Sequence, residues 1–281
     1  MKTIAVTGAS GFVGQHCIRA LAARGVCVLG LSRRPVGIES GQWRHLDLAN
    51  PDSVVVREIA ACHSLLHLAW GDLPNYQAPR HVHEELLIQR SFISEVCAAG
   101  QRSLVVSGTC LEYGMQEGAL SESLPTKPHV PYAVGKDVLR QHCQALAAER
   151  KVRLSWARLF YVYGPGQSAN SLWPQLQAAI KRGDARFPMS AGQQVRDFIR
   201  IEDAADTLAH LAIERADAGV VNVCSGEPVT VEQRVRRWLA DAGARMELEL
   251  GKYPYPTYEP FRFWGTRDKL DRVSRGPITP R

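Results

Sequence analysis

Short apolar segments alternate with amphipathic ones along the first 160 residues of the chain. The segments at 2–7, 26–31, 44–48, 64–69, 103–107 and 152–157 are short and mostly apolar, which predicts strands. Apolar positions recur at helical spacing between several of them, as in residues 12–25, 84–99 and 132–150. This alternation predicts an α/β fold with a doubly wound parallel sheet, whose ligands bind beyond the carboxyl ends of the strands.

The pattern changes beyond residue 165. Residues 172–182 predict a helix, 195–213 a strand and a helix, 220–223 a strand, and 228–242 a segment that contains a charged helix. The tail from Gly251 carries six aromatic residues between Tyr253 and Trp264. We expect this tail to pack over the functional site, within a smaller C-terminal lobe.

Composition restricts the class of protein. The 281 residues suffice for one large α/β domain and a smaller lobe. The net charge of +6 is dispersed and no nucleic-acid-binding motif appears, so we expect no nucleic-acid partner and a ligand that carries a diphosphate. Seven scattered cysteines without a C-x-x-C pair predict reduced thiols and no metal site. No apolar run reaches ~18 residues and Lys2 leads straight into a strand rather than a signal peptide, so we expect a cytoplasmic protein without membrane insertion.

The turn after the first strand is rich in glycine. Strand, glycine turn and helix follow one another, which is the context that a dinucleotide fingerprint requires. Gly8 permits the tight turn, Gly11 lets the backbone approach a pyrophosphate at the helix N-terminus, and Gly14 lets the helix lie close to the sheet. An ordinary glycine turn is the alternative. The predicted cofactor contacts here are Gly8, Ser10, Gly11, Phe12, Val13 and Gly14.

Two arginines follow the second strand, where an NAD site usually carries an acidic residue. The sequence there is Ser32-Arg33-Arg34, with no carboxylate before Glu39. Arginine binds a 2′-phosphate through charge-assisted hydrogen bonds, whereas a carboxylate would repel it. We therefore predict NADP(H), with NAD(H) possible and a solvated basic loop as the alternative interpretation.

Tyr132 and Lys136 stand one helical turn apart. A lysine cation within a few ångströms favours the phenolate and lowers the pKa of the tyrosine, so the pair can exchange a proton with a carbonyl or an alcohol. The spacing alone is common. It gains weight from the glycine turn that precedes it.

Other polar residues lie in or after predicted strands. Asp47 can accept a hydrogen bond from an adenine amino group, or it can cap a helix that starts near Pro51-Asp52. His67 lies within a buried strand, and we interpret it as a core histidine rather than a catalyst.

Taken together, the glycine turn, Asp47-Leu48, His67-Leu68-Ala69 and the Tyr132/Lys136 pair resemble the extended short-chain dehydrogenase/reductase family. That family includes nucleotide-sugar epimerases, dehydratases and reductases. The resemblance covers nearly the whole length, because residues 158–167, 196–203 and 221–228 are similar to its R-x-x-N-x-Y-G-P-G-Q, R-D-F-I-H-V-x-D and N-x-x-x-G-x-P segments.

The resemblance implies a Rossmann-type fold with a smaller C-terminal substrate-binding lobe. Residues 1–165 and about 195–225 would form the NADP-binding domain. Residues of about 166–194 and 226–281 would form the lobe that binds a nucleotide-diphosphate sugar. The family also implies a homodimer, formed through helices near 84–99 and 132–150.

Catalytic residues carry over by position. Thr109 lies where the family has its catalytic hydroxyl, which donates to the same oxygen that Tyr132 protonates. Thr109, Tyr132 and Lys136 form the implied triad, and Lys136 also holds the nicotinamide ribose. Further cofactor contacts are implied at Asp47, Leu48, Leu68, Ala69, Trp70, Ser107, Phe160 and Val162.

Substrate contacts carry over less directly. Arg196 would contact the diphosphate, and its alternative is a surface ion pair with Asp197 or Glu202. Tyr161 replaces the family's asparagine and Trp70 replaces a small residue, so both would alter the sugar pocket. The expected substrate contacts are Trp70, Thr109, Tyr161, Asn170, Ser171, Arg196 and Glu259.

The family's dehydratases resemble one another in an Asp-Glu pair directly after the catalytic threonine. Cys110-Leu111 follow Thr109 here, which disfavours dehydration. Residues 109–116 with Trp70-Gly71 resemble the 4-ketoreductases of bacterial deoxysugar and O-antigen pathways, and the short chain also favours a reductase. An NAD-dependent 4-epimerase is the alternative, and a non-catalytic NADP-binding regulator a minor one.

Overall fold

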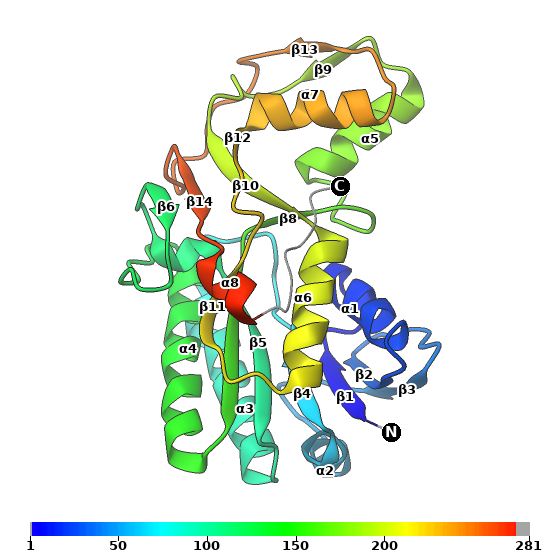
Figure 1. Ribbon diagram of the computed structural model, residues 1–281, viewed down its shortest axis with the longest axis vertical. Coiled ribbons are helices and arrows are strands. Elements are labelled where there is room, and N and C mark those ends of the chain that lie inside the picture. Colours follow the sequence, from blue (N-terminus) through cyan, green and yellow to red (C-terminus); the bar gives the residue numbers. More distant parts are fainter. Residues whose placement is uncertain (1, 274–281) are drawn as a thin grey trace.

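A parallel seven-stranded sheet forms the centre of the protein, in the order β11-β7-β5-β4-β1-β2-β3 (Figure 1). The computed structural model describes residues 2–273. The order reverses direction between β1 and β4, which creates the switch point where α/β sheets bind ligands. The predicted doubly wound α/β fold is confirmed. The strands are β1 (Thr3–Thr7), β2 (Cys27–Ser32), β3 (Gly41–His45), β4 (Ser64–His67), β5 (Ser103–Thr109), β7 (Arg153–Leu159) and β11 (Gly219–Val223).

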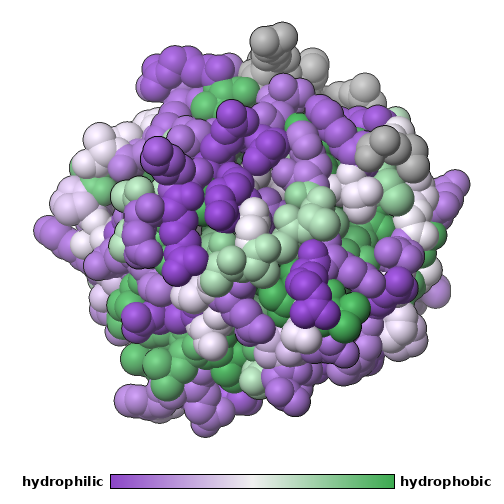
Figure 2. Space-filling view, turned by 90° about the horizontal axis from the view of Figure 1, so that it is seen from below, coloured by the Kyte–Doolittle hydropathy of each residue, from purple (hydrophilic) through white to green (hydrophobic). Residues whose placement is uncertain are grey.

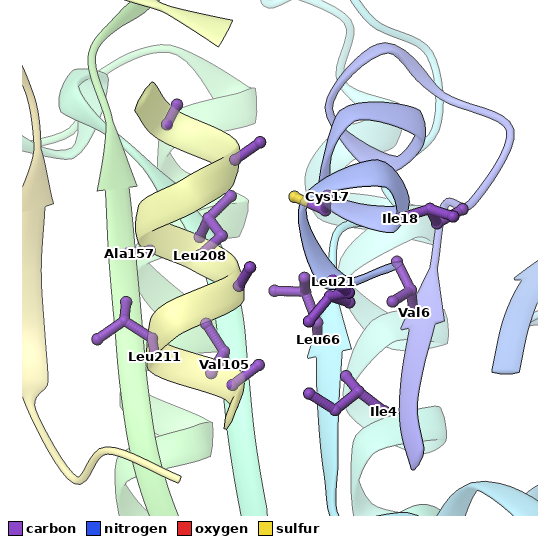
Figure 3. Close-up of a cluster of buried hydrophobic side chains, with 14 of the residues drawn as sticks. Ile4, Val6, Cys17, Ile18, Leu21, Leu66, Val105, Ala157, Leu208 and Leu211 are labelled. Atoms are coloured by element: carbon purple, nitrogen blue, oxygen red, sulfur yellow. The ribbon is translucent and has the colours of Figure 1, made fainter. Parts of the chain in front are cut away.

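Helices cover both faces of this sheet, because successive strand residues point to opposite sides. Ile4 and Val6 pack with α1 (Phe12–Ala22) and α6 (Ile201–Glu214), whereas Ala5 faces the other layer. Figure 3 shows the first of these cores, with Leu208 of α6 among its buried side chains. The opposite layer consists of α2 (Ser53–Ala61), α3 (Leu86–Ala98) and α4 (Pro131–Arg150).

Three boundaries differ from the sequence-based expectation. The third strand lies at Gly41–His45 rather than at 44–48. Asp52, not Asp47, caps α2, since its carboxylate accepts a hydrogen bond from Val54 N at 2.7 Å. A π-helical turn, η1 (His81–Glu85), precedes α3, so the expected helix at 84–99 begins earlier.

Smaller elements lie beyond the carboxyl ends of the large sheet, in the upper part of Figure 1. They include α5 (Leu172–Arg182), α7 (Val231–Asp241), and a sheet of β8 (Tyr161–Tyr163), β10 (Val195–Arg200) and β12 (Pro228–Thr230). β9 (Arg186–Pro188) pairs with β13 (Glu247–Glu249), and β6 (Gly118–Leu120) pairs with β14 (Phe263–Gly265). Among the described residues the last helix is α8 (Asp268–Val273), and a 3-10 turn, η2 (Cys110–Tyr113), follows β5. Residues 274–281 of the expected lobe lie outside the described residues.

The lower edge of the molecule in Figure 1 holds the amino ends of β1 and β4, and Figure 2 views the protein from that side, where polar and apolar areas are mixed. A surface hollow lined by Lys2, Thr3, Ala61 and His63 opens here. It lies at the opposite ends of the strands from the glycine turn, so it is not the site that the sequence predicts. Within residues 2–273, no helix is both long and apolar enough to span a membrane. All seven cysteines are free thiols.

Candidate active site

The glycine turn between β1 and α1 has no space for side chains at two positions. Gly8 has a φ of +70°, and a Cβ atom on it would lie 3.0 Å from Ala69 N at the end of β4. A Cβ on Gly14 would lie 2.1 Å from Gly8 O, so only glycine lets α1 approach the turn this closely. Gly11 caps α1 without a side-chain acceptor and the first turn carries no acidic residue. The free N–H groups and positive dipole end therefore fit the diphosphate of a dinucleotide.

The segment after β2 displays two arginines. Arg33 and Arg34 are exposed, and within residues 2–273 neither forms an ion pair. Ser32 is buried; its hydroxyl donates to Arg34 O at 2.6 Å and accepts from Trp43 Nε1 at 3.1 Å. Ser32 thus shapes the loop that presents the arginines, and the role of Trp43 had no signal in the sequence. Asp47 holds its own turn by accepting from Ala49 N at 3.1 Å.

Tyr132 is the second residue of α4 and packs against several aromatic side chains. Pro131 is the first residue of the helix, where its missing N–H costs no hydrogen bond. The Tyr132 ring is 5.8 Å from Trp70 in edge-to-face geometry and 5.3 Å from Tyr76, measured between centroids. Its backbone N–H donates to Tyr76 O at 3.1 Å. The loop between β4 and η1 therefore fixes both the start of α4 and the ring, which is 8% exposed.

Lys136 lies one turn further along α4 and is buried. Its Nζ donates to Ser107 O at 2.8 Å and lies 4.2 Å from the centroid of the Trp70 ring. The distance to the Tyr132 ring centroid is 6.0 Å. A Cβ on Gly135 would lie 2.8 Å from His81 O and 3.3 Å from Trp70 Cζ2, which explains glycine within this helix. Trp70 thus packs against both of the expected catalytic residues.

The expected low pKa of Tyr132 is wrong for this structure. Burial raises the pKa of Tyr132 above its ordinary value, and the nearby Tyr76, Glu112 and Cys110 raise it further. Only contact with the Thr109 side chain lowers it. Burial also lowers the pKa of Lys136, to about 8, against the opposing charges of Glu112 and Glu85. The sequence spacing predicted that Tyr132 and Lys136 lie close together, but it did not predict that both are buried. The phenol therefore keeps its proton at neutral pH.

Thr109 ends β5 beside Tyr132. It is buried, and its Oγ1 accepts from Leu111 N at 3.3 Å at the start of η2. Ser107, two residues earlier on the same strand, receives the Lys136 ammonium. The structure thus brings Thr109, Tyr132 and Lys136 together at the carboxyl end of β5, as the sequence predicts.

A buried polar network supports this site from below. His67 contacts Thr7 Oγ1 at 2.8 Å and the Gln89 side chain. Burial lowers the pKa of His67 to about 4, so it is a neutral core histidine, as expected. Gln89 donates to Glu85 at 2.7 Å, and Glu85 accepts from Gly71 N at 2.9 Å. Sequence reasoning missed Gln89 and Glu85, because polar residues on an amphipathic helix usually face solvent.

Arg196 is buried against the C-terminal tail. Its Nη2 donates to Glu259 Oε2 at 3.0 Å, and its Nη1 donates to Val195 O at 2.9 Å and Phe261 O at 3.0 Å. The guanidinium also lies 4.8 Å from the Phe263 ring centroid. The alternative of a surface ion pair with Asp197 or Glu202 is therefore wrong.

The aromatic tail reaches Tyr132 by way of Tyr76. Tyr258, next to Glu259, lies 6.1 Å from Tyr76, which in turn packs on Tyr132. The expectation that the tail packs over the site is confirmed at this point. Tyr253 and Phe261, by contrast, are exposed.

The remaining expected contacts lie around this centre. Leu68 and Ala69 follow β4 beside Gly8, and Phe160 is buried against Phe263. Tyr161 is partly buried, with its ring centroid 5.5 Å from the Arg196 guanidinium, and its hydroxyl has no hydrogen-bond partner among residues 2–273. The others are Leu48 after β3, Val162 in β8, and Asn170 and Ser171 before α5.

Comparison with known proteins places this arrangement in context. Residues 4–224 match the model of the NAD dependent epimerase/dehydratase family. The chain is 26% identical to a dTDP-6-deoxy-L-talose 4-dehydrogenase (NAD(+)) from Aggregatibacter actinomycetemcomitans, over 94% of this chain and 99% of that protein. It is 30% identical to a dTDP-6-deoxy-L-talose 4-dehydrogenase (NAD(P)(+)) from Kitasatospora kifunensis, over 87% of this chain and 80% of that protein. The solved structure of MoeE5 in complex with UDP-glucuronic acid and NAD is similar, with a TM-score of 0.84 and 26% identity, over 99% of this chain and 94% of that one.

Proposed function

Because the chain belongs to the NAD dependent epimerase/dehydratase family, we propose that it uses NADPH to reduce the C4 keto group of a nucleotide-diphosphate 4-keto-6-deoxyhexose. The observation that carries this proposal is the grouping of Thr109, Tyr132 and Lys136 at the carboxyl end of β5, where Lys136 Nζ donates to Ser107 O. A protonated phenol is the form that a ketone reduction requires, because the new alkoxide must receive a proton.

NADPH, when bound against the glycine turn, would supply a hydride and with it both electrons for the sugar C4 carbon. Tyr132 donates its proton to the C4 oxygen, so hydride and proton together convert the ketone to an alcohol. The Thr109 hydroxyl donates a hydrogen bond to the same oxygen and stabilises its developing negative charge. Lys136, held by Ser107 O and the Trp70 ring, places a positive charge beside the phenolate that Tyr132 becomes.

The environment of Thr109 argues against dehydration. Cys110 and Leu111 are buried, and burial raises the pKa of the Cys110 thiol. The next residue, Glu112, is the first carboxylate after Thr109, and it is committed to Arg158 at 2.7 Å. No acid or base of this segment is free to remove a sugar proton or to expel water.

Relatives support the position of the reaction on the sugar. Two are 4-dehydrogenases of a dTDP-6-deoxyhexose, which by name interconvert a C4 alcohol and a C4 ketone. One carries NAD(+) in its name and the other NAD(P)(+), so the relatives allow either cofactor. The exposed Arg33 and Arg34 support NADP(H), because a guanidinium binds a 2′-phosphate that NAD lacks.

We propose that the substrate lies between the sheet edge and a lobe built from α5, α7 and the tail. Arg196 would then meet the diphosphate, and Glu259 would have to give up at least part of its ion pair with this guanidinium. The family resemblance supports a homodimer through α3 and α4. The seven free thiols support a reducing compartment such as the cytoplasm.

The test is to follow the NADPH absorbance band while the protein is given dTDP-, CDP- and GDP-4-keto-6-deoxysugars, with NADH in parallel. Consumption of one NADPH per ketone reduced, and faster reaction with NADPH than with NADH, is the expected result. Interconversion of 4-hydroxy sugars without net loss of reduced cofactor would identify a 4-epimerase instead. Binding of NADPH without turnover of any sugar would indicate a non-catalytic regulator.

A further inference from the structure

We propose that Glu112 is a positioning residue for this reaction: it fixes Thr109 so that the threonine hydroxyl points its proton at the C4 oxygen of the substrate. This inference rests on the proposed function. It concerns a carboxylate that lies three residues after Thr109 and that the mechanism above leaves unused.

The first observation is a reciprocal pair of hydrogen bonds at the start of η2. Glu112 Oε1 accepts from Thr109 N at 2.9 Å, and Thr109 Oγ1 accepts from Leu111 N at 3.3 Å. This capping box fixes both the backbone and the side chain of Thr109. Because the Leu111 N–H lies against one lone pair of Oγ1, the hydroxyl proton points away from Leu111, which leaves it available to the substrate oxygen in the proposed reaction.

The second observation is that Glu112 is itself immobilised. The carboxylate is completely buried; it accepts from Arg158 Nε at 2.7 Å and from Trp156 Nε1 at 3.0 and 3.1 Å. Arg140 of α4 lies 3.9 Å away and adds a second positive charge. β7 and α4 thus hold the carboxylate from two sides, and the carboxylate holds Thr109.

Gly108 of β5 lies close to the Glu112 carboxylate. A Cβ atom there would lie 2.6 Å from Glu112 Oε1 and 2.2 Å from Trp156 Nε1. Only glycine therefore lets β5 approach the buried carboxylate just before Thr109. This packing explains the glycine that precedes Thr109.

Glu112 does not act on the substrate directly. Both of its oxygens are used by donors within the protein, and it has no exposed surface. Its charge nevertheless reaches the site, where it raises the pKa of Lys136 and of Tyr132. It therefore acts through residues that touch the substrate.

A double-mutant cycle tests this role. Glu112→Gln keeps the size of the side chain. Its NH₂ group must then face an N–H donor of Thr109, Trp156 or Arg158, so at least one of these hydrogen bonds is lost. We expect kcat to fall about 10- to 100-fold in the wild-type background, on the scale of a misplaced oxyanion donor. In a Thr109→Val background the same change should alter kcat less than about 3-fold, because the coupled partner is gone. Equal falls in both backgrounds would overturn the proposal.

A matched control separates positioning from loss of stability. Val221→Ala removes two methyl groups from β11 in the core that α1 and α6 cover, on the other face of the sheet from Trp156, and leaves every contact of Glu112 in place. We expect it to lower the urea midpoint as Glu112→Gln does while kcat falls less than about 3-fold, since stability alone does not set transition-state contacts. A fall in kcat that follows the urea midpoint across both variants would contradict the inference.

A measurement without turnover keeps the two proposals distinguishable. The amide proton of Thr109 donates to a carboxylate, so its NMR resonance should lie downfield and move upfield in Glu112→Gln. An unchanged resonance would overturn the assignment of Glu112. Failure of the wild-type protein to reduce any keto sugar would refute the proposed function instead, and would leave the resonance as the test of the Glu112 contact.

Discussion

The ammonium of Lys136 lies 4.2 Å from the centroid of the Trp70 indole ring, close enough for a cation–π interaction. Trp70 is held in turn, because its Nε1 donates to His81 Nδ1 at 3.1 Å. Burial lowers the pKa of Lys136 to about 8, so the indole face stabilises a charge that the surroundings disfavour. An aromatic residue in a loop thereby helps to set the protonation of a residue on α4.

Trp70→Leu should therefore move the pH dependence of the reaction. Loss of the ring face lowers the pKa of Lys136 further, so the alkaline limb of kcat should shift to lower pH by about 0.5 to 1.5 units. Trp70→Phe keeps a ring and should shift the limb by less. The measurement is kcat between pH 6 and 10 for wild type, Trp70→Leu and Trp70→Phe. Superimposable alkaline limbs would show that Trp70 does not affect the pKa of Lys136.

The burial of Lys136 should also make the free energy of unfolding depend on pH. Between pH 8 and 10.5 the unfolded chain holds a proton on this lysine that the folded protein has lost, so the free energy of unfolding rises with pH through that window. Lys136→Met removes the rise. Wild type should gain about 2–3 kcal/mol relative to this variant between pH 7 and pH 10.

Urea titrations of both proteins at several pH values measure that difference, and other titrating groups cancel in it. Lys181→Met, which removes an exposed lysine near the end of α5, serves as the control and should follow wild type at every pH. Parallel curves for wild type and Lys136→Met would mean that Lys136 titrates normally.

Sequence periodicity predicted the doubly wound sheet because strand and helix spacings are set locally by the backbone. The glycine turn was equally readable, since Gly8 and Gly14 occupy positions where a Cβ atom would collide with backbone. Placement of Tyr132 with Lys136 followed from helical spacing. Each of these features depends on residues that are near one another in the chain.

The parts that sequence could not supply depend on distant residues. The pKa of Tyr132 is raised because Trp70 and Tyr76, more than 50 positions earlier, bury it. The Arg196 partner proved to be Glu259, 63 residues away, rather than its neighbour Asp197. Neither pairing leaves a periodic signal in the sequence.

The two arginines after β2 should determine cofactor choice. Replacing both, as Arg33→Ser with Arg34→Ser, should raise the KM for NADPH about 10- to 100-fold, the value of one or two charge-assisted hydrogen bonds. The KM for NADH should change less than about 3-fold, because NADH has no 2′-phosphate for them to bind. Arg182→Ser, on α5, is the matched control and should alter neither. An equal rise of both KM values would assign the arginines to the shared diphosphate instead.

Tyr132→Phe removes one oxygen and keeps the ring that packs against Trp70 and Tyr76. Turnover should fall about 10²- to 10⁴-fold, the usual scale of acid–base assistance, with little change in the urea midpoint. Tyr163→Phe, whose ring packs on Trp238 in α7, is the control and should retain turnover. Steady-state rates that stay near normal in Tyr132→Phe would remove this residue from the role of proton donor.

In the proposed reaction, a hydride reaches C4 of the sugar while Tyr132 protonates the oxygen. NADPH that carries two deuterium atoms at nicotinamide C4, reacted with the 4-keto-6-deoxysugar that the protein turns over, follows this hydride. NMR of the product should show one deuterium at sugar C4 for each NADPH oxidised. A product without deuterium, or with deuterium at another carbon, would contradict the account.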